Sequence, residues 1–108
     1  MANVYSTQFL TSHAGAPVTV FVPAGFVAVI RTITAFNASV IAPETAALVL
    51  VAEGVTIWQS LLTPGPPDVP NSSAVVNMRT VLNAGQAIAT NNGSDIDMTV
   101  SGYLLSLP

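Results

Sequence analysis

The sequence contains no cysteine and no lysine, and its only cationic side chains are Arg31 and Arg79. Without cysteine the chain cannot form disulfides, thiolate nucleophiles or cysteine-ligated metal sites. Nucleic acids and anionic membrane surfaces are bound through clusters of Lys and Arg. Two arginines far apart in the sequence do not predict such a cluster, so we expect neither nucleic acid nor a membrane surface as a partner.

Charge of either sign is scarce. Charged residues make up 6% of the chain, whereas they make up roughly 25% of an ordinary soluble domain. A folded monomer of this mass exposes roughly 5,700 Å², so there is about one charge per 800 Å², close to the area that one partner buries in a standard interface. Hydrophobic residues reach 51%, enough for a core. We therefore expect a single domain whose surface is partly covered by other subunits, as in a homo-oligomer.

The chain also lacks targeting and membrane signals. Its first residues, "MANVYSTQFLTSHAG", have no basic region followed by an apolar stretch, so no signal peptide is predicted. No apolar run approaches the ~20 residues of a membrane-spanning helix. Three N-x-[ST] sequences begin at Asn37, Asn71 and Asn92. Without a secretion signal we interpret them as turn residues, and we expect synthesis in a host cytoplasm.

Catalytic and metal-binding patterns are missing as well. His13 is the only histidine, no G-x-S-x-G surrounds a serine, and the several histidines of a cupin-type metal site are absent. Asp95 and Asp97 flank Ile96, but no third and fourth oxygen ligand stands beside them for calcium. We predict a protein that is not an enzyme and binds no metal or cofactor.

Apolar residues recur with period two, which is typical of β-strands. Turn sequences such as "HAGAP", "PAG", "NASVIAPE", "EG", "NAG" and "NNGS" separate the alternating segments. The spacing predicts eight strands near residues 3–11, 17–22, 26–37, 45–53, 55–62, 74–83, 86–91 and 96–107. Short strands at this spacing favour an all-β, single-domain antiparallel β-sandwich over residues 1–108, of the jelly-roll type.

Arg31 lies inside the apolar segment "FVAVIRTITAF". Strict alternation separates Val27, Val29, Arg31, Ile33 and Ala35 from Phe26, Ala28, Ile30, Thr32, Thr34 and Phe36. Both sets are mostly apolar, although a two-layer sandwich buries only one face of each sheet. We therefore expect a partner subunit to cover the second face.

A buried arginine at such an interface needs a carboxylate. Glu53, Asp95 and Asp97 are the candidates, on this chain or on a neighbour. The alternative is that Arg31 extends its guanidinium into solvent from a half-exposed strand. Arg79 shares a face with Asn77, and we expect that face to be more exposed to solvent than the face with Arg31.

The role of Trp58 has more than one interpretation. Trp58 in "VTIWQSLL" is either a core residue, which we favour, or an interface anchor. A carbohydrate-binding platform would instead need Trp58 beside other exposed aromatics, for which Tyr5 and Tyr103 are the candidates.

The segment 62–73 contains four prolines and no strand pattern. Long loops of this kind are often functional. It is either a crossing between the two sheets or an extended arm on a neighbouring subunit.

Several segments together resemble those of small tailed-bacteriophage virion proteins. They are "VFVPAGFVAVIRTITAFNAS", "GVTIW", "NMRTVLNAGQAI" and "MTVSGYLLSLP". The resemblance implies a β-sandwich, typically trimeric, that serves as a head decoration (cement) protein or as a collar or minor tail protein. It brings no catalytic residues. The capsid protein or other virion proteins would then be the partners. The alternative function is a receptor- or carbohydrate-binding β-sandwich module.

Overall fold

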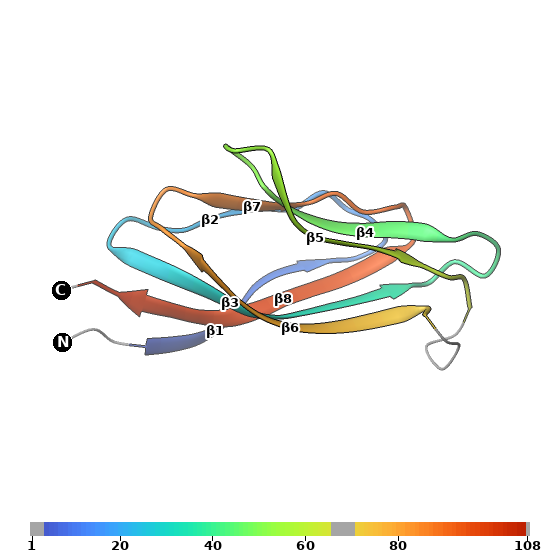
Figure 1. Ribbon diagram of the computed structural model, residues 1–108, viewed down its shortest axis with the longest axis horizontal. Coiled ribbons are helices and arrows are strands. Elements are labelled where there is room, and N and C mark those ends of the chain that lie inside the picture. The colour runs from blue at the N-terminus through green and yellow to red at the C-terminus, as the bar shows by residue number, and fades with distance from the viewer. Residues whose placement is uncertain (1–3, 66–70, 108) are drawn as a thin grey trace.

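Eight strands and no helix make up residues 4–65 and 71–107, the part of the chain that the structure, a computed structural model, describes (Figure 1). The eight predicted strands are all present, with shorter bounds for some. They are β1 (Val4–Ser12), β2 (Thr19–Phe21), β3 (Phe26–Asn37), β4 (Glu44–Leu50), β5 (Val55–Leu62), β6 (Ser73–Leu82), β7 (Ala87–Thr90) and β8 (Ile96–Ser106).

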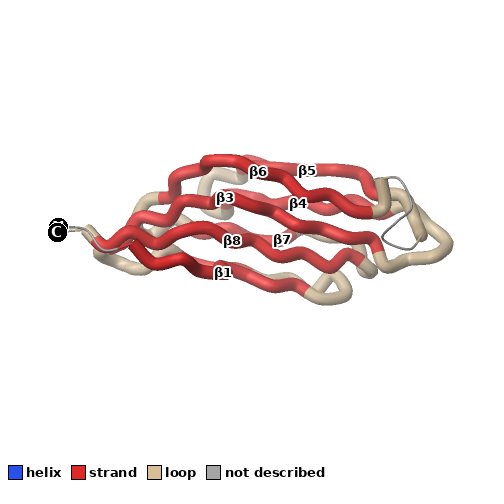
Figure 2. Tube along the Cα trace, turned by 90° about the horizontal axis from the view of Figure 1, so that it is seen from below, coloured by secondary structure: helices blue, strands red, loops and turns tan. Residues whose placement is uncertain are grey.

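The strands form two four-stranded sheets that pack face to face. One sheet has the order β1-β8-β3-β6 and the other β2-β7-β4-β5, and every paired strand is antiparallel. Figure 2 shows the first sheet in front of the second. Two interleaved sheets in this order are the arrangement of a jelly roll. The predicted fold class is therefore confirmed.

Alternation places the core between the sheets. In β8, Ile96, Met98 and Val100 are buried while the residues between them are half-exposed. β6 alternates over its whole length, as predicted. The central buried cluster also contains aliphatic residues of β3, β4 and β7, among them Ile33, Leu48 and Ile88. Small and branched side chains of this kind fill the space between the sheets without polar atoms.

Strict alternation is wrong in β3. Ile30 and Ile33 are both fully buried, so Arg31 and Thr32 both point outward. The register explains this, because Ile30 pairs with Gly102 and Thr32 with Ser101, which leaves Arg31 as an extra residue opposite β8. This β-bulge reverses the facing of the second half of the strand. Ile33 and Ala35 are consequently core residues, and Thr32, Thr34 and Phe36 join Arg31 outside.

The first and last strands lie side by side. Val4 pairs with Leu105, so both ends of the described chain emerge at the same end of the sandwich (Figure 1). The molecule measures 50 × 25 × 18 Å, with the strands running along the long axis. The apolar C-terminal segment "YLLS" is the end of β8 and pairs with both β1 and β3.

β5 and β6 belong to different sheets, so the proline-rich segment connects one sheet to the other. Its two ends are joined, since the Thr63 amide donates to the Asn71 carbonyl at 2.9 Å. Residues 66–70 lie outside the described residues, and so does the predicted arm.

Candidate functional site

The outer face of the β1-β8-β3-β6 sheet carries Arg31, the charged residue inside the apolar segment of β3. We call it the arginine face. It has an apolar half, a polar centre with both arginines, and a hydroxyl-rich end. Its outward side chains include Val4, Gln8, Thr11, Val27, Val29, Arg31, Thr32, Thr34, Val75, Asn77, Arg79, Val81, Thr99, Ser101, Tyr103 and Leu105.

The two arginines lie on adjacent strands. Ile30 pairs with Thr80 and Thr32 pairs with Asn77, so Arg79 of β6 stands across from Arg31 of β3. Both are exposed. Because of the bulge, two successive residues of β3, Arg31 and Thr32, lie on the outer side of the sheet. The only two cations of the sequence are therefore neighbours on one surface.

Arg31 forms one wall of a shallow hollow of about 430 Å³. Residues of β1 and β8 line the rest of it, namely Thr7, Gln8, Ser101, Gly102 and Tyr103, with Thr32 beside the arginine. Gly102 is essential to its shape, since a Cβ added there would overlap the carbonyl oxygen of Val29 and lie 3.0 Å from the Arg31 amide nitrogen. Glycine inside a strand often marks such a close backbone approach.

No carboxylate among the described residues lies within ion-pair distance of Arg31 or Arg79. The predicted pairing of Arg31 with an acid of its own chain is therefore wrong within residues 4–65 and 71–107. The alternative describes the observed state, with the Arg31 side chain directed into solvent from a strand whose inner side is buried.

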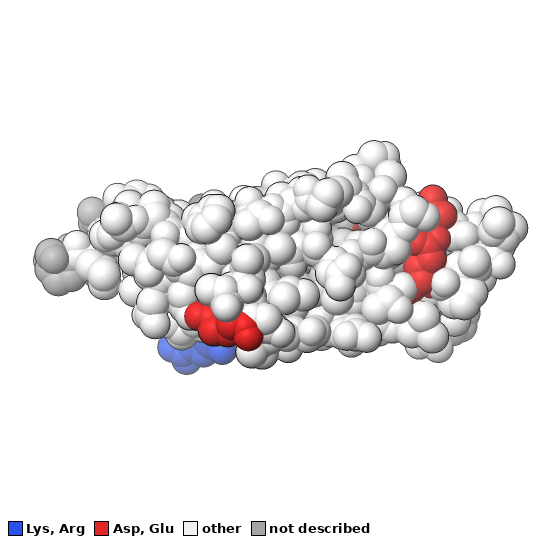
Figure 3. Space-filling view, turned by 90° about the horizontal axis from the view of Figure 1, so that it is seen from above, with Lys and Arg blue, Asp and Glu red and all other residues white. Residues whose placement is uncertain are grey.

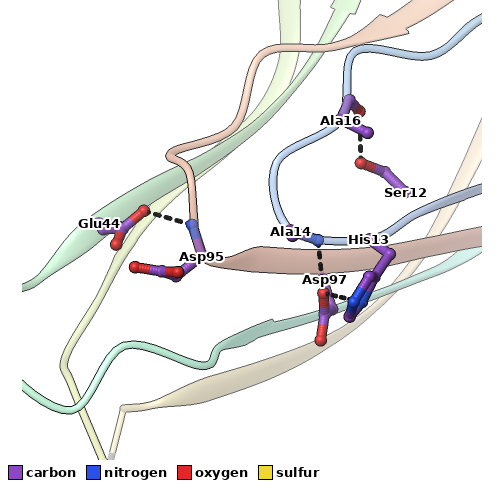
Figure 4. A network of polar contacts seen from close by, with 7 residues as sticks. All are labelled: Ser12, His13, Ala14, Ala16, Glu44, Asp95 and Asp97. Atoms are coloured by element: carbon purple, nitrogen blue, oxygen red, sulfur yellow. Dashed lines mark hydrogen bonds and ion pairs between the residues drawn. The ribbon is translucent and has the colours of Figure 1, made fainter.

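Two of the acidic side chains, those of Glu44 and Asp97, accept hydrogen bonds from backbone amides (Figure 4). Glu44 accepts a hydrogen bond from the Asp95 amide at 2.8 Å. Asp97 accepts one from the Ala14 amide at 2.9 Å and contacts His13 Nδ1 at 2.9 Å. These contacts fix the turn that contains His13, which confirms His13 as an exposed loop residue. The described residues contain no cluster of His, Asp or Glu that could hold a metal ion.

Glu53 is the most exposed of the candidate acids. It lies in the turn 51–54 between β4 and β5, which projects from the sandwich at the top of Figure 1. Among the described residues, the Glu53 carboxylate accepts one long hydrogen bond, of 3.4 Å, from the Gln86 side chain. Glu53 therefore makes no ion pair with either arginine of its own chain.

The aromatic residues do not form a platform. Trp58 is half-buried and packs against the central core, which confirms the preferred interpretation. Tyr103 lies on the other sheet, at the edge of the arginine hollow and 37% exposed. Tyr5 instead contacts Phe26, with ring centroids 6.3 Å apart. A sugar site built from Trp58 and Tyr103 together is therefore ruled out by the fold.

An apolar band runs across the arginine face next to the hollow. Tyr103 pairs with Val29, and Val29 pairs with Val81, so three apolar side chains form one row across β8, β3 and β6. The next row contains Val4, Leu105 and Val27. Val4 and Val81 are exposed. Since no other element of the described chain covers this face, the band meets water in the isolated subunit.

The opposite face, formed by the β2-β7-β4-β5 sheet, carries few charged side chains (Figure 3). Two larger apolar residues stand out on it, Phe21 at one end and Leu61 at the other, and both are exposed. Ala47, Val49, Ala87 and Ala89 share this side of the sheet between them, and Ala47 and Ala87 are buried.

Two features of the surface were not predicted from the sequence. The adjacency of the arginines depends on the bulge, for which the sequence carries no local signal. The second is the loop 38–43, where Val40 and Ile41 are exposed. Its sequence, "ASVIAP", gives a signal that could have been used, because two β-branched residues stand inside a turn segment.

The sequence matches no protein-family model and no curated protein. Among solved structures, the fold is similar to a chain in the structure of infectious bursal disease virus, Gt strain, at 12% identity and a TM-score of 0.38. The match covers 97% of this chain and 31% of the viral one, so this chain spans about a third of that chain's length. Neither a shared family nor a shared function follows at that level of similarity. No helix in the described residues could span a membrane.

Proposed function

We propose that this protein is a non-enzymatic structural component of a virion, which assembles with copies of itself through the arginine face. The finer form of the proposal is a trimer that docks on the capsid of a tailed bacteriophage as a decoration protein, or on its collar or tail. The motif resemblance noted in the sequence supports that finer form.

One observation carries the proposal: the arginine face combines an exposed apolar band with the protein's two cations, both without a partner in the described chain. Buried interface centres are apolar and often include arginine and tyrosine. The whole molecule exposes 5830 Å², close to the area expected for a monomer of this mass. Its charge density is thus as low as the composition predicts.

The face also indicates what the partner surface must contain. Two adjacent guanidinium groups favour a carboxylate, which an arginine can bind through two parallel hydrogen bonds. In a homo-oligomer, an acidic side chain of a second copy would supply it. On a virion, an acidic patch of the capsid or tail protein would serve in the same way.

The test uses two exposed valines of nearly equal exposure. Val81 on the arginine face is 55% exposed and Val55 on the other sheet is 53% exposed. We expect the wild-type protein to be a trimer in light scattering coupled to gel filtration. Val81→Asp should weaken the assembly at least tenfold, about 1.4 kcal/mol, because it places an unpaired charge in the apolar band. Val55→Asp should leave the mass unchanged.

A wild-type protein that stays monomeric over the whole concentration range would contradict self-assembly. Equal behaviour of the two aspartate variants would remove the arginine face as the interface. The virion role is tested separately by cryo-electron microscopy of the parent particle, where density for this sandwich on the head, collar or tail is expected.

The hollow at Arg31 supports a second candidate, a receptor- or carbohydrate-binding module. Tyr103, Gln8 and Ser101 beside an arginine are side chains that suit an acidic sugar, with stacking on the ring and a carboxylate on the guanidinium. Titration of the protein with sialic acid and with uronic acid oligosaccharides tests it. A shift of the Tyr103 and Arg31 signals in NMR at millimolar sugar would favour this function, and no shift would exclude it.

A further inference from the structure

The loop between β3 and β4, residues 38–43, presents two aliphatic side chains at one end of the sandwich, the right-hand end of Figure 1. Val40 is 80% exposed and Ile41 is 88% exposed. These are the most exposed large apolar side chains of the described protein. The loop contains no charged residue.

This loop has a dense internal set of hydrogen bonds. The buried Asn37 side chain donates to the carbonyls of Ala42 and Leu62 at 3.1 and 3.0 Å and accepts from the Ser39 amide at 2.9 Å. The Ser39 hydroxyl accepts from the amides of Ile41 and Ala42, each at 3.2 Å. Val40 and Ile41 are therefore displayed on an organised backbone, so binding costs little conformational entropy.

A matching pocket lies at the other end of the same molecule. It is a cavity of about 150 Å³ between β1 and β2, lined mainly by apolar side chains, including Phe9, Val20, Val22, Leu82 and Leu104, with Thr7 at β1. No charged residue lines it. An apolar cavity of about this volume holds one benzene-sized group. One branched aliphatic side chain is therefore of the right size and polarity.

The loop cannot reach the pocket of its own chain. Ala28, which lines the pocket, and Asn37, which begins the loop, are both in β3. Nine strand residues separate them by roughly 30 Å. Any contact between the two features must therefore join two copies of the chain.

We propose that the loop 38–43 of one copy inserts Ile41, with Val40 beside it, into the β1–β2 pocket of a second copy. Loop and pocket agree in size, in apolar character and in lack of charge. Such a contact is heterologous, because different surfaces of the two copies meet, and repeating it generates a ring or a filament.

This inference rests on the self-assembly proposed above. Two side chains cover much less than the roughly 800 Å² that each partner buries in a standard interface. The inserted loop therefore acts together with the arginine face and determines which neighbour is bound and in which orientation.

The test pairs a loop-deficient variant with a pocket-deficient one. Val40→Ser/Ile41→Ser removes the inserting side chains, and Val20→Phe fills the pocket from β2. Phe21→Asp, at an exposed position lining the same pocket, is a second pocket variant in case Val20→Phe does not fold. Val51→Ser/Val55→Ser and Val55→Phe are matched controls at exposed positions of the β4–β5 hairpin. Light scattering and analytical ultracentrifugation give the masses.

We expect each deficient variant alone to lose at least tenfold in association constant, and both controls to behave as wild type. An equimolar mixture of the loop-deficient and pocket-deficient variants should form a 1:1 dimer and nothing larger, because only one intact loop and one intact pocket remain in each pair.

A wild-type oligomer that all these variants leave unchanged would overturn the loop insertion and leave the proposed assembly intact. So would loss of association in the loop variant alone, with both pocket variants unaffected. A mixture without the 1:1 dimer also overturns the inference. A monomeric wild-type protein would instead contradict the proposed function itself.

Discussion

At the scale of single residues, Asn37 shows how one buried amide organises a surface. It is fully buried, yet its side chain makes three hydrogen bonds that connect β3, the following loop and the end of β5. Buried carbonyls without a donor are costly. The asparagine is therefore a structural requirement of the loop. Its position in an N-x-[ST] sequence reflects that role, in agreement with the interpretation of these sequences as turn residues.

We predict that Asn37→Ala lowers the free energy of unfolding by about 2–4 kcal/mol, because the carbonyls of Ala42 and Leu62 lose their donor in a buried site. Asn37→Asp should be nearly as harmful, since a carboxylate can accept from Ser39 but cannot donate to the two carbonyls. Urea denaturation followed by tryptophan fluorescence measures both variants.

Asn77→Ala is the control, because Asn77 is exposed and its contact with Thr32 is long at 3.3 Å. We expect it to change stability by less than about 0.5 kcal/mol. Equal effects of Asn37→Ala and Asn77→Ala would mean that the buried hydrogen bonds do not hold the loop.

At the scale of elements, the decisive irregularity is the bulge of β3 against β8. Arg31 gains its outward position from it, and the backbone of β3 moves so close to β8 that only glycine fits at position 102. The same contact determines the floor of the arginine hollow. Bulge, glycine and arginine therefore form one feature, although they are far apart in the sequence.

Gly102→Ala tests this feature. The added Cβ would overlap the Val29 carbonyl oxygen, so we expect a loss of about 1–3 kcal/mol in stability from the forced backbone shift. Ser101→Ala, one residue earlier and outside the close approach, should be close to neutral. Thermal unfolding followed by circular dichroism distinguishes them. If Gly102→Ala has the melting temperature of the wild-type protein, the two strands can move apart at no cost in stability.

The same element shows what sequence reasoning can and cannot reach. β6 alternates over its whole length and β8 alternates from Ile96 to Ser101, so period two alone identified both faces of these segments correctly. In β3 the pattern "FVAVIRTITAF" is apolar on both faces, and strict alternation put Ile33 beside Arg31. Only the pairing with β8 shows that one extra residue intervenes. Strand pairing joins residues that are distant in the sequence. The adjacency of the two arginines and the hollow beside Arg31 therefore could not be predicted from the sequence.

At the scale of the whole molecule, low charge dominates the behaviour in solution. The net charge is −3 at pH 7 and the sequence pI is about 4.4. Both sheet faces expose apolar side chains, among them Phe21, Leu61 and Val81. Repulsion between molecules is therefore weak at neutral pH and falls further as the carboxylates are protonated.

We predict reversible association as the pH falls from 7 towards 4.4, because net charge approaches zero while the apolar faces remain exposed. Dynamic light scattering should show growing particles near pH 4.5 and recovery on return to pH 7. Circular dichroism recorded in parallel should show an unchanged β spectrum. Particle sizes independent of pH between 7 and 4.5 would contradict the prediction.

The adjacency of the first and last strands has a consequence for display. Because Val4 pairs with Leu105, a peptide or reporter domain fused to either end would emerge from the same pole of the sandwich. The loop with Val40 and Ile41 occupies the opposite pole. A fused domain would leave that loop exposed but would stand at the pole of the β1–β2 pocket, so a bulky fusion is expected to obstruct the insertion of a neighbour's loop there.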